Sequence, residues 1–209
     1  MVNYGEAIKR PFQDVKKLII GIFLSLIPIV NFIALGYILE NVKPGARKNY
    51  KLTEWGNWWE LFVKGMAYMV IGFVYMIPAL MVLFLTIGVA AIRGLFTDMS
   101  TETFLAILPA LGIGILVFFV LFLVAVYIIP SAVMNYVSKN KFSAAFEFSA
   151  ITKKAFRADY FVAWLIATIY TAVITLLLVW LPWIGTAMAT FIGTLTYYTI
   201  ISEAWASSK

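Results

Sequence analysis

Residues 18–39 read LIIGIFLSLIPIVNFIALGYIL and form the first long apolar run of the chain. A helix of roughly 20 apolar residues is long enough to cross a bilayer. Pro28 and Asn31 interrupt the run near its centre, and both residue types favour turns. The run is therefore either one kinked transmembrane helix or a hairpin of two short helices with its tip at these two residues. The choice decides on which side of the membrane the rest of the chain lies.

The composition is that of an integral membrane protein. The 209 residues are 63% hydrophobic and 12% charged, whereas a soluble domain is about half apolar and about a quarter charged. The other apolar runs are continuous rather than alternating, which favours helices over the strands of a β-barrel. We therefore expect an all-α membrane protein in one domain, with transmembrane helices at 61–92, 104–137, 160–181 and 183–203.

The distribution of lysine and arginine favours the hairpin. If residues 18–39 cross the membrane, the better orientation leaves 11 cations inside and 5 outside; if they turn back, 15 of the 16 lie on one side. Loops on the cytoplasmic side carry an excess of these cations. The sequence thus predicts four transmembrane helices plus an N-terminal re-entrant hairpin, in the cell membrane, with both termini in the cytoplasm.

Three segments are expected at the membrane surface. Residues 1–17 are interpreted as an interfacial arm that binds lipid headgroups or, equally, as a solvated leader. Residues 138–159 predict a basic amphipathic surface helix. Trp55, Trp58 and Trp59 have the spacing of an aromatic belt, which is favoured over a ligand-binding aromatic box. The net charge of +6 is attributed to contacts with anionic headgroups of the cytoplasmic leaflet rather than to nucleic acid.

The last two runs are joined by a turn at 182–185 and must be antiparallel neighbours. Gly185, Ala189 and Gly193 recur every four residues, as in helices that pack closely in membranes. Threonines on both helices predict a polar seam, although each hydroxyl can instead bond its own helix. The seam consists of Thr171, Thr175, Thr190 and Thr194.

The sequence offers little chemistry for catalysis. It contains no cysteine and no histidine, so Ser131 and Ser149 have no histidine to activate them. The span interiors hold essentially no ionisable residues, which usually mark ion and proton pathways in membranes. We expect no enzyme activity, no catalytic residue, no cofactor and no metal site.

Four stretches resemble the domain of unknown function 4013 family. They are the arm RPFQDVKKLIIG, the segment LIPIVNFIALGYILENVK with the later LTEWGNWWELFVKG, and YIIPSAVMNYVSKNKFSAAFEF in the second half. The resemblance implies a polytopic membrane protein of mainly archaeal type. The family name carries no activity.

Two functions stay open at this point. The first is a non-enzymatic membrane scaffold or accessory protein that assembles with itself or organises lipid, because the hairpin, the basic segments and the tryptophans all favour one leaflet. The alternative is a permease or channel for a neutral small molecule or lipid, with helices broken by proline and the threonine seam lining its path.

Overall fold

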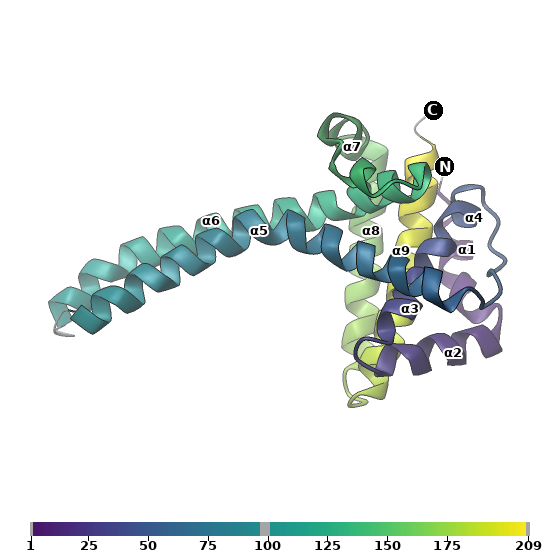
Figure 1. Ribbon diagram of the computed structural model, residues 1–209, viewed down its shortest axis with the longest axis horizontal. Coiled ribbons are helices and arrows are strands. Elements are labelled where there is room, and N and C mark those ends of the chain that lie inside the picture. Colours follow the sequence, from purple (N-terminus) through teal and green to yellow (C-terminus); the bar gives the residue numbers. More distant parts are fainter. Residues whose placement is uncertain (1, 97–100, 208–209) are drawn as a thin grey trace. The chain divides into compact units, whose positions relative to one another are not determined.

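The computed structural model describes residues 2–96 and 101–207, and Figure 1 shows its ribbon. The described residues form helices and their connections, without a strand. The elements in chain order are α1 (Tyr4–Lys9), the 3-10 helix η1 (Arg10–Phe12), α2 (Val15–Leu26), α3 (Asn31–Glu40), α4 (Val42–Ala46), α5 (Trp58–Phe96), α6 (Thr101–Lys139), the 3-10 helix η2 (Phe142–Phe146), α7 (Phe148–Ala155), α8 (Ala158–Leu178) and α9 (Ile184–Ala206).

Four of these helices are long and apolar enough to cross a membrane: 58–92, 107–139, 158–178 and 184–206. At 1.5 Å per residue, the 21 residues of α8 and the 23 of α9 extend about 31 Å and 34 Å. These lengths match the ~30 Å hydrocarbon core of a bilayer. The expectation of an all-helical membrane protein with four candidate spans is confirmed.

The chain divides into two compact units. The first unit comprises residues 1–71 and 130–209, and the second comprises residues 72–129. Both long helices, α5 and α6, contribute to each unit. In the first unit, α9 (yellow in Figure 1) runs beside α8, and the N-terminal helices pack against its other faces.

Helix α9 forms the core of the first unit because it is the least apolar span. Its mean hydropathy is 1.3, against 2.3 for α8. Within an 18-residue stretch of α9, 67% of the residues are buried, against 11% for α8. A helix that contacts other helices needs small and polar side chains, whereas a lipid-facing helix needs only apolar ones. The serines, threonines, glycines and alanines of α9 thus reflect its position inside the protein.

The first apolar run is two helices rather than one. Asp14 caps α2 by accepting a hydrogen bond from the Lys17 backbone N–H, and α2 ends where the chain becomes extended at Ile27, ahead of Pro28. A residue before proline avoids the helical region. Ile29 follows with a left-handed φ of 71°, and α3 begins at Asn31. The predicted tip residues therefore lie at the turn between the two helices.

Helix α2 has two distinct faces. Gly21 is buried against the ring of Phe191 on α9, and a Cβ built on this glycine would lie 2.1 Å from that ring. The opposite face exposes Val15, Ile19 and Phe23, which recur every four residues and therefore lie in one stripe.

Helices α3 and α5 cross at backbone distance. A Cβ on Gly36 would lie 1.8 Å from the Leu61 carbonyl oxygen, and one on Gly65 would lie 1.9 Å from the Phe32 carbonyl oxygen. Two glycines, one on each helix, thus remove the side chains that would separate them. The sequence analysis did not anticipate this contact, because the glycines lie in different segments and form no local ridge.

The predicted surface helix at 138–159 is divided in the structure. Helix α6 continues to Lys139, and η2, α7 and the start of α8 occupy the rest. Asn140 has a left-handed φ of 54°, which ends α6. The Asn135 side chain then donates a 2.7 Å hydrogen bond to the Ala144 carbonyl oxygen and fixes η2 beneath the helix end.

The second unit is an antiparallel pair formed by the distal parts of α5 and α6. Gly114 on α6 lies against Thr86 on α5, so closely that a Cβ on the glycine would be 2.2 Å from the threonine hydroxyl oxygen. The Thr86 hydroxyl donates to the Val82 carbonyl oxygen of its own helix. The outward side chains of this unit are large and apolar, as Phe84 and Leu116 illustrate.

Candidate functional site: a buried polar centre and two charged clefts

Arg10 is the centre of a polar network at the carboxyl-terminal end of α9. Its side chain is completely buried. The guanidinium donates hydrogen bonds to the Tyr50 carbonyl oxygen (3.1 Å), the Thr199 hydroxyl (2.9 Å), and both the carbonyl (2.9 Å) and the side-chain oxygen (3.4 Å) of Asn41. Burial lowers the pKa of Arg10 to about 10, and Tyr37 and Glu203 oppose this shift. The group is therefore charged at neutral pH.

Asn41 connects this centre to the segment after α4. Its amide nitrogen donates to the Tyr37 carbonyl oxygen (2.9 Å) and to the Thr53 hydroxyl (3.0 Å). Its side-chain oxygen accepts from the Thr53 backbone N–H (3.0 Å) as well as from Arg10. One fully buried amide thus joins α3, the following loop and the N-terminal arm.

Glu203 on α9 supplies the negative charge nearest to this centre. Its carboxylate accepts from the Asn3 backbone N–H (2.8 Å) and from the Tyr50 hydroxyl (3.0 Å). Although Glu203 lies close to the end of its helix, it is only 4% exposed. Burial and the bond to Glu203 raise the pKa of Tyr50 to about 12, so the phenol stays a hydrogen-bond donor at neutral pH.

Lys17 joins the arm to the same loop. Its ammonium group donates to the Leu52 carbonyl oxygen (3.0 Å) and to the Glu54 carboxylate (2.7 Å), and Asp14 lies 3.4 Å away. The bond to Glu54 raises the pKa of Lys17. Arg10 and Lys17 belong to the arm, for which the sequence left headgroup contact and a solvated leader equally open; both side chains are buried among protein groups of the first unit.

The three tryptophans of the predicted belt have different surroundings. Trp55 stacks on Tyr37, with ring centroids 3.7 Å apart, and also contacts Phe191. Trp58 and Trp59 are exposed at the start of α5. The structure therefore places Trp55 in the packing around α9 and leaves the other two at the surface.

The predicted packing residues and the threonine seam lie on α8 and α9. Gly185 and Gly193 face α8 closely, since Cβ atoms there would be 1.8 Å from the Leu178 carbonyl oxygen and 3.1 Å from Thr171; Ala189 is buried. The hydroxyls of Thr171 and Thr175 donate to carbonyls of α8 itself. Of the seam, Thr175 and Thr190 are exposed, and Thr171 and Thr194 are half-buried.

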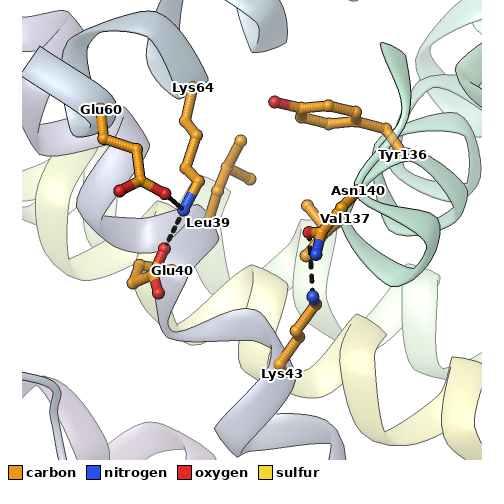
Figure 2. Close-up of a pocket in the computed structure, with 8 residues that line it drawn as sticks. All are labelled: Leu39, Glu40, Lys43, Glu60, Lys64, Tyr136, Val137 and Asn140. Atoms are coloured by element: carbon orange, nitrogen blue, oxygen red, sulfur yellow. Dashed lines mark hydrogen bonds and ion pairs between the residues drawn. The ribbon is translucent and has the colours of Figure 1, made fainter. Parts of the chain in front are cut away.

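A charged cleft of about 450 Å³ opens beside the polar centre. Figure 2 shows Lys64 between the carboxylates of Glu40 and Glu60, and Lys43 bonded to the Asn140 side-chain oxygen at 2.9 Å. The remaining lining residues are Leu39, Tyr136 and Val137. The two acids balance the two lysines, so this cleft carries no net charge.

A second cleft, of about 550 Å³, lies on the other side of Lys43 and Val137, which line both. Its charged lining residues are Lys43, Arg47 and Lys154. Lys154 also lies over the ring of Trp205, 4.4 Å from its centroid. The sequence did not reveal this group of cations, because nothing local in it indicates that residues of α4 and α7 line one cleft.

Within the described part of the chain, no group of three or more acids is close enough to hold a metal ion. The fold and these clefts define the class of protein: an all-helical membrane protein whose buried polar groups gather at one end of its central helix. The chain belongs to the family described as "Protein of unknown function (DUF4013)", whose model matches residues 20–183. The comparisons with curated proteins and with solved structures give no match.

Proposed function

We propose that the protein is a non-enzymatic membrane scaffold that is held against one leaflet by the polar end of its first unit and organises the lipids there. In this proposal residues 18–39 form a re-entrant hairpin and both termini are cytoplasmic. The observation that carries it is a shared location: the arm and the segment 41–54 are hydrogen-bonded to each other and to the same end of α9.

The hydrogen bonds bear directly on topology. A transmembrane helix at 18–39 would place the arm and the following loop on opposite faces of a hydrocarbon core ~30 Å thick. Arg10, however, bonds Asn41 and Tyr50, and Asn3 bonds Glu203 near the end of α9. The positive-inside count supports the same arrangement and favours a cytoplasmic location for this end.

The surface of the hairpin supports membrane insertion. The outward stripe of Val15, Ile19 and Phe23 is exposed in the first unit, and contact with hydrocarbon gives such side chains an apolar environment. Backbone at membrane depth needs cover from protein, and the packing of Gly21 on Phe191 provides it for α2.

A scaffold is favoured over a permease by the contact between α8 and α9. A path along the threonine seam needs open space between these two helices. It also needs threonine hydroxyls that face this space. Gly193 instead lies against Thr171, and the hydroxyls of Thr171 and Thr175 are bonded to carbonyls of their own helix. The exposed apolar faces of the spans are suited to lipid or to a second copy.

Reconstitution into vesicles tests this function. Vesicles contain a fluorescent anionic lipid at low density, and its self-quenching reports clustering. We expect quenching to rise with protein content, while osmotic swelling in glycerol, urea or small sugars stays at the rate of protein-free vesicles. Swelling that accelerates in proportion to protein content, without clustering of lipid, would contradict the scaffold function and support a permease. Native mass spectrometry of the same sample measures self-assembly.

A further inference from the structure

We propose that the cleft lined by Lys43, Arg47 and Lys154 is a binding site for the phosphate group of an anionic amphiphile. This inference deepens the proposed function and rests on it for the source of the ligand, which we take to be a phospholipid headgroup of the adjacent leaflet. The cleft combines three cations from two helices with an apolar wall, and both features match one ligand class.

The charge of the two neighbouring clefts distinguishes them. In the cleft of Figure 2, Lys64 is neutralised by Glu40 and Glu60, and these carboxylates repel an anion. In the cationic cleft, the described lining residues include three cations and no acid. Among the described residues, no carboxylate lies within ion-pair distance of Lys43, Arg47 or Lys154. An anion is therefore the ligand whose charge this cleft can balance.

The surroundings of Lys154 disfavour its charged form. Partial burial lowers the pKa of Lys154, and the positive charges of Arg157 and Lys139 lower it further. Lys154 lies over the ring of Trp205 in a cation–π contact, and Lys43 donates to a neutral group, the Asn140 amide oxygen. A bound phosphate would accept charge-assisted hydrogen bonds from both ammonium groups.

The rest of the wall indicates an amphiphile. Val42, Met134, Val137 and the indole of Trp205 line the cleft beside the cations. An inorganic ion would use only the charged part of this surface. A lipid would place its phosphate on the lysines and the first part of its glycerol and acyl chains on the apolar wall. Both the charged and the apolar contacts would then contribute to its binding.

The test uses the full-length protein in detergent and native mass spectrometry with added phosphatidylglycerol. We expect one lipid retained at substoichiometric loading by the unchanged protein. Lys43→Gln and Lys154→Gln should each weaken retention at least tenfold. The matched control is Lys153→Gln, which removes the same charge from the neighbouring, exposed position on α7. A neutral lipid, phosphatidylcholine, gives the background.

Equal losses in Lys153→Gln and Lys154→Gln would overturn the proposal, since binding would then follow net charge alone. Retention unchanged in both cleft variants would overturn it as well. Competition arms with inorganic phosphate and glycerol phosphate separate the sources. Displacement only by lipid supports a headgroup, and equal displacement by glycerol phosphate supports the phosphate site with a soluble ligand. Loss of lipid clustering with retention intact would contradict the scaffold function but not this site.

Discussion

The two units of the chain are packed by different means. The first unit buries Arg10, Asn41 and Glu203 around a central helix of low hydropathy. In the second unit, Gly114 of α6 lies against Thr86 of α5, and large apolar side chains such as Phe84 and Leu116 are exposed. The hydropathy of a span in this protein therefore depends on what surrounds it. Helix α9, which is surrounded by protein, is the least apolar of the candidate spans.

The largest effect is expected where helices meet at backbone distance in the first unit. Gly36→Ala or Gly65→Ala places a methyl group on a backbone oxygen that cannot move aside. We expect a loss of about 3 kcal/mol in the free energy of unfolding, measured by denaturant titration in detergent. The control is Gly72→Ala on α5, where nothing lies within 4 Å of the new methyl group. Equal effects at the three positions would contradict the close crossing.

The buried polar centre is the next most sensitive feature. Arg10→Met keeps the length of the side chain but leaves Thr199, the Tyr50 carbonyl and the Asn41 carbonyl without their donor. Unsatisfied buried groups and the loss of charge opposite Glu203 should reduce stability by about 2 kcal/mol. Lys9→Met, at the adjacent and largely exposed position, should change it by less than about 0.5 kcal/mol. A smaller effect at Arg10 than at Lys9 would refute the centre.

The helix contact of the second unit should tolerate change better than the first. Gly114→Ala meets the side chain of Thr86 rather than backbone, so local adjustment limits the cost to about 1 kcal/mol. Thr86→Ala creates the space, and the double variant should recover most of the loss. A double-mutant cycle in the same titration measures the coupling. Additive losses would show that these residues are not in contact.

The smallest effect concerns Tyr50, and it depends on pH. Tyr50→Phe removes a hydrogen bond to Glu203 and should reduce stability by about 0.5 kcal/mol at pH 8. The folded protein raises the pKa of this phenol to about 12, above the unfolded value of 10. The contribution is therefore present below pH 10 and is lost as the pH rises toward 12. A difference between the two proteins that grows across this range would contradict the assignment.

The sequence was sufficient for the features that are local. Apolar runs located the four candidate spans, and Pro28 and Asn31 located the helix break. The repeat of small residues every four positions indicated a ridge at Gly185, Ala189 and Gly193. In the structure its two glycines lie close to α8. In each case the signal lies within one segment, where length and period are visible.

The features that the sequence did not reveal depend on distant segments. Arg10 looked like one of several surface cations, and nothing near it indicated bonds to residues 41 and 199. Gly36 and Gly65 showed no period, because the partner of each lies on another helix. The cationic cleft likewise is lined by residues that are far apart in the sequence, from Lys43 to Lys154. Such contacts follow from the fold and not from local composition.

The proposed topology requires that the arm and the segment after α4 lie on the same side of the membrane. The chain has no cysteine, so single cysteines can be placed at the charged positions Lys9 and Lys51 and, as a reference for the opposite side, at Leu181. An impermeant maleimide is applied to intact cells and then to permeabilised cells. With the proposed topology, we expect positions 9 and 51 to be labelled only in permeabilised cells and position 181 to be labelled in intact cells. Labelling of positions 9 and 51 from opposite sides would contradict it.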